Sequence, residues 1–311
     1  MSLTIWLILI TILGPVVGAV LVWLAGDKRP QIQNGLAVLF SLISVVAAIA
    51  LLPKATADTV ISLPAGPAYG SITFIPDGLS VFLAVVATGI GCLAVIFSVD
   101  YMRDAPQLGR YYFLVLFFIG AMSGLVLTGS IFVMFFFWEI TAYCSYALIS
   151  FYNDDPKAVR GGMNALIITQ FGGIGLLIGA LIVFAYLGDY QIDSLLSRYG
   201  EMPPQILSLT AFTFLIAAMA KSAQVPFQTW LPDAMETPSP VSALIHAATI
   251  APDWLSFAPS AIFFQTYRRV VSCSKFTMPR KVIQGPSAAL SPTWCSLSMW
   301  PGWAKRRTRW P

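Results

Sequence analysis

Long apolar segments are the feature that most constrains how this chain can fold. Seven of them lie at residues 3–25, 33–52, 77–99, 111–129, 131–151, 163–187 and 206–235, and an eighth begins near Val241. A helix that crosses a bilayer needs about 20 apolar residues. Only 10% of the 311 residues are charged, against about 25% in soluble domains. The sequence therefore predicts an all-α integral membrane protein, whose first segment is a retained helix because no basic residue precedes it.

The seventh segment, residues 206–235, is too long for one straight crossing and contains Lys221 and Pro226. Proline removes a backbone donor and collides with the preceding turn. Unwound backbone at membrane depth is tolerated only where protein or a water-filled cavity surrounds it. We therefore expect a bundle of about 7–8 transmembrane helices with a broken seventh helix, and a broken helix hints at an ion path.

The basic residues of the loops predict an orientation, because they favour cytoplasmic loops. With the N-terminus outside, the inner loops hold Lys28, Arg29, Arg103, Arg110, Lys157 and Arg160, whereas the outer loops hold only Lys54 and Arg198. We therefore expect the N-terminus to lie outside. Residues 53–76 are expected to form an external loop with a short strand pair, and residues 189–204 another with one surface helical turn. Asp154, Asp155, Lys157 and Arg160 are expected to form a charged loop.

Three ionisable residues stand out within the predicted spans: Glu139, Lys221 and His246, the last being the only histidine. A charge at the bilayer centre costs about 2.5–3.5 kcal/mol on insertion scales, so such residues face the bundle interior or a water path. Burial disfavours the charged forms of a glutamate and a lysine, while their attraction favours them. A pair balanced in this way can exchange protons. The alternatives are a purely structural ion pair for Glu139, a snorkelling side chain for Lys221, and neutral packing for His246.

Other polar and small residues are assigned supporting roles. Pro226, Trp230, Pro232 and Asp233 surround the predicted break, and Asp233 is expected to cap or anchor its far end. Asp77 is expected to cap a helix. Gly172, Gly173, Gly175 and Gly179 lie within a span, where small residues let helices approach closely. The four cysteines show no paired spacing and no nucleotide fingerprint is visible, so we expect no metal site, cofactor or catalytic redox centre in this chain.

The string from residue 221 to 249 reads KSAQVPFQTWLPDAMETPSPVSALIHAAT. It resembles the signature of the antiporter-like membrane subunits of respiratory complex I (proton-translocating NADH:quinone oxidoreductase, its L type), Mrp-type sodium/proton antiporters and energy-converting hydrogenases. Asp-Gly-Leu-Ser from Asp77 and Phe-Trp-Glu ending at Glu139 also match. Complex I subunits of the L type often carry an acidic residue near the position of Gly172 and Gly173, so the glycines look more like the Mrp type.

This resemblance implies a fold of about fourteen helices with two inverted repeats, each containing a broken helix. Residues 1–110 would form an N-terminal three-helix region, and residues 111–250 the first repeat up to the start of the eighth helix. Glu139, Lys221 and His246 match the family's proton-relay residues. The implied partners are other membrane subunits and the lipid bilayer, with no nucleic acid. The implied location is a bacterial or archaeal cytoplasmic membrane.

The resemblance stops near Ile250. From Pro252 onward there are seven prolines, eight serines, five tryptophans and nine Lys+Arg against one acidic residue, so residues 251–311 form an atypical basic tail. One hypothesis is a reading-frame shift near codon 250 that truncates the subunit after the first repeat. The alternative is a genuine basic tail on the membrane surface that binds anionic lipids through Lys305, Arg306, Arg307 and Arg309.

Three functions follow as hypotheses. The first is a proton- or sodium/proton-translocating subunit of a complex I-like, Mrp-like or hydrogenase assembly, in which any enzyme activity belongs to the whole complex. The second is a stand-alone cation/proton antiporter. The third is a nonfunctional membrane fragment with merely paired polar residues.

Overall fold

The computed structural model describes residues 3–27, 29–55, 61–64, 71–103 and 105–246. These residues belong to one compact unit, Met1–Ser272. The expected basic tail, residues 251–311, lies outside the described residues, as do both hypotheses about it.

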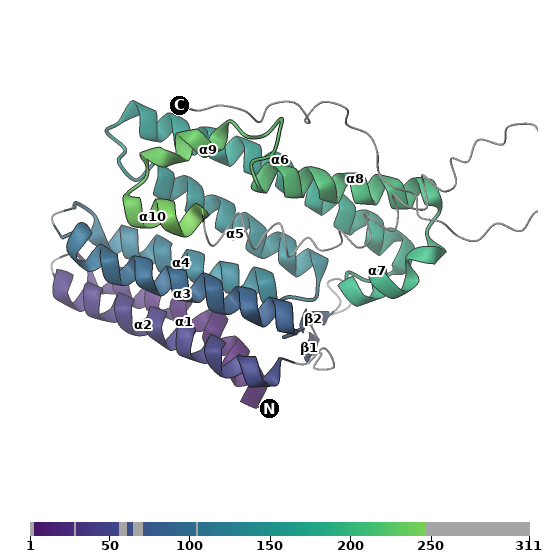
Figure 1. The fold of residues 1–311 in the computed structure, drawn as a ribbon, viewed down its shortest axis with the longest axis horizontal. Coiled ribbons are helices and arrows are strands. Elements are labelled where there is room, and N and C mark those ends of the chain that lie inside the picture. Colours follow the sequence, from purple (N-terminus) through teal and green to yellow (C-terminus); the bar gives the residue numbers. More distant parts are fainter. Residues whose placement is uncertain (1–2, 28, 56–60, 65–70, 104, 247–311) are drawn as a thin grey trace, which may run out of the picture. The chain divides into compact units, whose positions relative to one another are not determined.

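Seven helices of the described chain are long and apolar enough to cross a membrane (Figure 1). They are α1 (Leu3–Ala25), α2 (Pro30–Leu51), α3 (Gly78–Tyr101), α4 (Leu108–Leu127), α5 (Ile131–Ile149), α6 (Pro156–Leu187) and α8 (Pro204–Lys221). Each coincides with one predicted apolar segment, so the all-α membrane fold is confirmed. The start of the predicted eighth span appears as α10 (Ser239–Leu244). The chain is an integral membrane protein.

Neighbouring helices pack mainly in chain order (Figure 1). Helix α4 is the most buried of the seven spans and contacts α1, α2, α3 and α5. Helix α6 packs against α5 on one side and against α8 on another. Helices α5 and α8 both contact α6. A side-chain hydrogen bond also joins α8 to α5, so side chains of the three helices meet inside the bundle.

Helix α6 begins earlier than the sequence pattern predicted. Pro156 stands in the first turn, and the carboxylate of Asp155 accepts a hydrogen bond from the Lys157 backbone N at 2.9 Å. Proline at the first helical position and aspartate before it are favoured start signals, because the first turn has unpaired N–H groups. The expected charged loop is therefore wrong in part, since Lys157 and Arg160 lie on the helix.

A short hairpin follows α2, as predicted. Strand β1 (Ile61–Pro64) pairs antiparallel with β2 (Ser71–Phe74), and Ile61 lies opposite Phe74. Beyond it, Gly129 N donates to the Thr73 carbonyl oxygen at 2.8 Å, and Phe74 forms a bridge with Thr128. The hairpin is thereby joined to the α4–α5 connection. Asp77 caps α3 as expected, accepting from Ser80 N at 2.7 Å.

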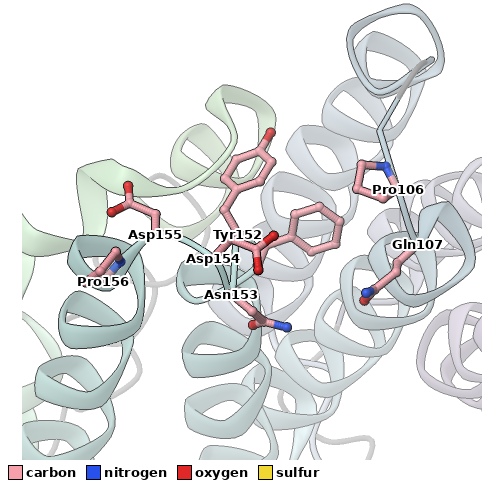
Figure 2. Close-up of a pocket in the computed structure, with 8 residues that line it drawn as sticks. Pro106, Gln107, Tyr152, Asn153, Asp154, Asp155 and Pro156 are labelled. Carbon is pink, nitrogen blue, oxygen red and sulfur yellow. The ribbon is translucent and has the colours of Figure 1, made fainter.

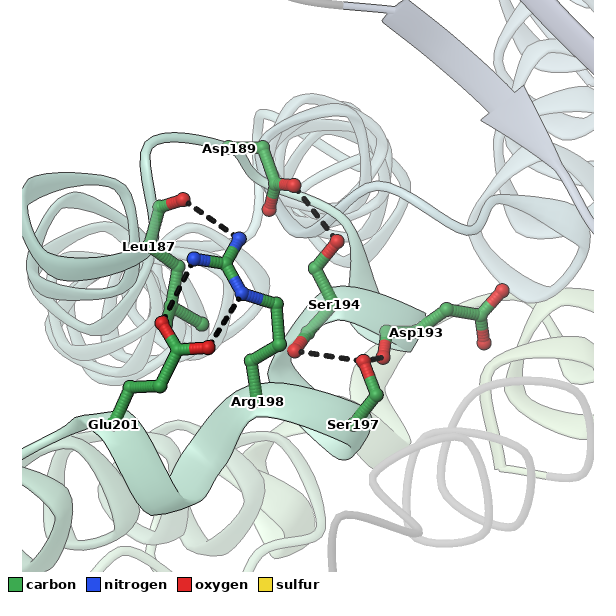
Figure 3. Close-up of polar contacts among 7 residues, drawn as sticks. All are labelled: Leu187, Asp189, Asp193, Ser194, Ser197, Arg198 and Glu201. Atoms are coloured by element: carbon green, nitrogen blue, oxygen red, sulfur yellow. Dashed lines mark hydrogen bonds and ion pairs between the residues drawn. The ribbon is translucent and has the colours of Figure 1, made fainter.

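A polar cluster holds the connection between α6 and α8, which contains the short helix α7 (Ile192–Arg198) (Figure 3). The guanidinium of Arg198 forms an ion pair with Glu201 at 2.8 Å and donates to the Leu187 carbonyl oxygen at 3.2 Å. Ser194 donates to Asp189 at 2.7 Å. A basic side chain on the last carbonyls of a helix compensates their partial negative charge. Arg198 therefore fastens the surface helix to the end of α6.

We expect acid to weaken this cluster. The Arg198 guanidinium lowers the pKa of Glu201 below its usual value of 4.5. A carboxyl with a lowered folded-state pKa stabilises the fold above the ordinary value, and the stabilisation is lost as pH falls through the lowered one. Both side chains are exposed, so the effect is small. Thermal unfolding in detergent should show wild type above Glu201→Gln at neutral pH and equal to it in strong acid. A gap that is independent of pH would contradict the assignment.

Candidate ion-relay site

The predicted break in the seventh span is present. Helix α8 ends at Lys221, and the chain resumes helical structure only at α9 (Trp230–Asp233). Between them Ala223 takes a left-handed conformation with φ of 50°, and Gln224 N donates to the Met219 carbonyl oxygen at 2.9 Å. Non-helical backbone leaves free the carbonyl groups that an intact helix would hydrogen-bond. Lys221 is the last helical residue before that region.

The residues expected to support the break lie around it. Pro226 is within the non-helical connection, and the exposed Pro232 lies in α9. Trp230 is buried, and its indole N–H donates to the Ala220 carbonyl oxygen at 3.0 Å. The carboxylate of Asp233 accepts from the Asn164 side chain at 2.8 Å. The Trp230 hydrogen bond spans the break, and the Asp233 hydrogen bond fastens α9 to α6. Asp233 therefore anchors α9 to a neighbouring helix.

Lys221 is almost completely buried, with 1% of its surface exposed. Its Nζ donates to Thr141 Oγ1 at 2.8 Å and lies 4.9 Å from the centroid of the Trp138 ring. An ammonium above an indole face is attracted by the ring's electron distribution. Both partners belong to α5. A lysine from the broken span is therefore held by hydrogen bonding and by a cation–π contact inside the bundle.

Glu139 lies on the same helix, half-buried. Its carboxylate interacts electrostatically with Lys221 and with the side chain of Gln170 on α6. Its Oε1 atom is buried and has no hydrogen-bond partner among the described residues. A groove of about 380 Å³ between α4 and α5, lined by Phe113, Phe136 and otherwise mostly apolar side chains, also reaches Glu139. The structure thus places a carboxylate and a lysine within electrostatic range in apolar surroundings.

The glycines of α6 make two kinds of contact. A Cβ at Gly172 would lie 2.7 Å from the Ala220 Cβ, and one at Gly175 would lie 2.9 Å from the Thr213 carbonyl oxygen. These glycines let α6 and α8 approach closely, as predicted. A Cβ at Gly173 would instead collide with Glu139 Oε1. Gly173 therefore provides the space that the carboxylate occupies.

His246 lies just beyond α10, which packs against α3. Its Nδ1 donates to the Ser242 carbonyl oxygen at 2.7 Å, and its buried Nε2 has no hydrogen-bond partner among the described residues. An imidazole that donates through Nδ1 offers Nε2 for taking up a proton. The described contacts bring Glu139 and Lys221 together, whereas the hydrogen bond of His246 stays within its own turn.

A second hollow, of about 510 Å³, lies between the α3–α4 and α5–α6 loops. Figure 2 shows Gln107, Tyr152, Asp154 and Asp155 around it. Partial burial raises the pKa of the Tyr152 hydroxyl. These loops belong to the side that the basic residues predict to be cytoplasmic.

Thr141 and Gln170 are polar site residues that the sequence pattern did not reveal. Both are uncharged and lie within apolar runs, where buried threonines are common. Only Thr141 lies close to Glu139 in the sequence, and nothing marks Gln170. The contact of Thr141 with Lys221 joins residues 80 positions apart. Such a pairing depends on how the helices pack.

Comparison with known families gives two matches. Residues 128–253 match the family model described as NADH:quinone oxidoreductase/Mrp antiporter, TM, and residues 63–112 match the model described as NADH-Ubiquinone oxidoreductase (complex I), chain 5 N-terminus. The first match contains Glu139, Lys221 and His246.

Individual relatives point the same way. The chain is 42% identical over 176 residues, 56% of its length, to Na(+)/H(+) antiporter subunit A1 of Staphylococcus haemolyticus, and 39% identical over 175 residues to that of Staphylococcus aureus. It spans 22% of the length of these curated relatives.

Two solved structures share the fold. The Mrp complex from Dietzia superimposes with a TM-score of 0.71 at 27% identity, over 81% of this chain and 27% of that one. The archaeal membrane-bound sulfane sulfur reductase does so with a TM-score of 0.68 at 20% identity, over 78% of this chain and 51% of that one.

Proposed function

This chain belongs to the antiporter-like membrane subunit family of NADH:quinone oxidoreductases and Mrp antiporters, and on that premise we propose that it moves protons across a membrane. The observation that carries the proposal is the burial of Lys221 at the end of a broken helix, with the Glu139 carboxylate in electrostatic range. An intramembrane lysine costs free energy, so its presence is a sign of function. Buried apolar side chains of similar size would fill the same space without that cost.

The relay requires a proton to pass between the two groups. When protonated Lys221 gives its proton to the Glu139 carboxylate, an N–H bond breaks, an O–H bond forms, and both groups become neutral. Burial favours that neutral state, whereas electrostatic attraction favours the charged pair. A change in charge nearby then decides which state is populated. His246 is proposed as a further member, since its Nε2 is available to a proton.

Sodium/proton exchange is the form of transport that we propose. The curated relatives are named Na(+)/H(+) antiporter subunits, and α6 carries Gly172 and Gly173 where complex I subunits of the L type often have an acidic residue. Other membrane subunits would be its partners, as the relatives' designation as subunits suggests. We propose the cytoplasmic membrane as its location, with the N-terminus outside, from the distribution of basic residues.

Ion-driven proton movement tests this function. Inverted vesicles would be prepared from a host that lacks its own sodium/proton antiporters and expresses this gene together with its neighbouring genes. After acidification of the vesicle lumen, added Na⁺ should discharge the pH gradient reported by a fluorescent dye. Vesicles without this gene supply the blank. A discharge of the pH gradient equal to that of the blank would contradict the proposed transport. A discharge that does not require Na⁺ would exclude sodium as the coupling ion.

A further inference from the structure

One face of α5 carries three polar or aromatic side chains, and two of them, Trp138 and Thr141, contact Lys221. Trp138, Thr141 and Ser145 are three and four residues apart and therefore lie on the same side of the helix. Trp138 and Thr141 are both fully buried, and Ser145 is 6% exposed. Thr141 donates to the Trp138 carbonyl oxygen at 2.8 Å, and Ser145 donates to the Thr141 carbonyl oxygen at the same distance.

The hydroxyl proton of Thr141 is therefore committed to the backbone. Since a threonine hydroxyl has one proton and two lone pairs, Thr141 meets Lys221 only as an acceptor. That arrangement agrees with the 2.8 Å contact in which Lys221 Nζ donates. A hydrogen bond from a charged donor is about twice as strong as a neutral one, so the site favours an amine that carries its full set of protons.

Glu139 points to another side of the same helix. Successive helical residues are turned by about 100°, so Glu139 and Thr141 point about 160° apart. In agreement, the Glu139 carboxylate lies against Gly173 of α6 and interacts with Gln170. Lys221, coming from α8, is held on the Trp138–Thr141 face.

We propose that Thr141 is a positioning residue of the ion relay, and this inference rests on the proposed function. Its hydroxyl, with the Trp138 ring, fixes the place from which Lys221 exchanges a proton with Glu139. Opposite charges attract strongly at low dielectric. Without the hydrogen bond to Thr141, the Lys221 ammonium would be drawn toward the Glu139 carboxylate. Thr141 counters that movement and so keeps the proton transferable.

The alternative is that Thr141 has only a structural role, and an experiment can distinguish the two roles. Many threonines of membrane helices bond only to a carbonyl of the preceding turn. Thr88 on α3 is such a residue: it is fully buried, and its hydroxyl donates to the Ala84 carbonyl oxygen at 2.7 Å. Thr88→Val is therefore the matched control for Thr141→Val, since both remove a buried hydroxyl and keep the branched shape.

The test combines ion flux with a direct view of the lysine. In the vesicle assay Thr141→Val should lose about tenfold in rate, the equivalent of one hydrogen bond to a charged group. Thr141→Ser should restore most of the rate, and Thr88→Val should leave it unchanged. In protein with ¹⁵N-labelled lysine in lipid, the Lys221 Nζ resonance, assigned by its loss in Lys221→Met, should move in Thr141→Val and stay in Thr141→Ser.

Each outcome decides one question. An unmoved Nζ resonance, a normal rate in Thr141→Val, or an equal loss in Thr88→Val would overturn the role of Thr141. A normal rate in Lys221→Met would overturn the proposed relay, whatever Thr141 does. The resonance test does not depend on transport, so the two failures are distinguishable.

Discussion

Lys221→Met is expected to abolish ion translocation while leaving the protein folded. Methionine has a similar length and no charge, so it removes the proton-carrying amine with little change in volume. General acid–base groups contribute about 10²–10⁴-fold to rate, and we expect a loss of at least about 100-fold on that basis. Flux in the vesicle assay, normalised to the amount of protein in the membrane, measures the change.

The thermal stability of this variant separates function from structure. A buried charge costs free energy, but removing one partner of a buried pair is destabilising where the remaining charge stays uncompensated. Because Glu139 can become neutral by taking up a proton once the lysine is gone, Lys221→Met should still fold and should unfold in detergent near the temperature of the wild type. Lys157→Met, which alters an exposed lysine on the first turn of α6, is the control and should transport normally. A large fall in stability for Lys221→Met would mean that the lysine is a structural brace.

Gly173→Ala is expected to impair transport almost as strongly, although it adds only one methyl group. The new Cβ would clash with Glu139 Oε1, so the carboxylate would have to move from its place. A displacement of about 1 Å in a reacting group can cost about 100-fold in rate. Gly89→Ala on α3 is the matched control, because a Cβ there meets nothing within 4 Å. Both changes exchange a helical glycine for alanine and share the same gain in helix propensity.

A second-site change checks the cause of the Gly173→Ala defect. Aspartate is shorter than glutamate by one methylene, so Glu139→Asp should make room for the added methyl group. We expect Gly173→Ala to lower the rate of Glu139→Asp by a much smaller factor than it lowers the rate of the wild type. Equal loss in Gly89→Ala, or no effect of Gly173→Ala, would contradict the contact between Gly173 and the carboxylate as a determinant of flux.

The membrane fold was predictable because it depends on quantities that a sequence shows directly. Apolar length determines the spans, and Pro226 with Lys221 placed the break where α8 ends. The start of α6 was predicted too late, since the charged residues Lys157 and Arg160 concealed a helix that Pro156 begins. Local start signals were the better guide there than hydropathy.

The surroundings of the proposed relay residues were less predictable. Glu139 and Lys221 are recognisable because ionisable groups are rare in apolar runs, but their neighbours carry no such mark. Thr141 and Gly173 become informative only when α5, α6 and α8 are packed together. The glycines of α6 were correctly expected to let helices approach, yet the sequence did not distinguish the ones that face α8 from Gly173, which faces Glu139.

Proton flux through Glu139→Gln tests the relay most directly. The amide keeps the size of the glutamate side chain and its ability to hydrogen-bond with Gln170, but it cannot take up and release a proton at physiological pH. In the vesicle assay, at equal protein content, the Na⁺-dependent discharge of the pH gradient should fall to the level of vesicles that lack this chain. Discharge at the wild-type rate would contradict a relay through Glu139 and Lys221.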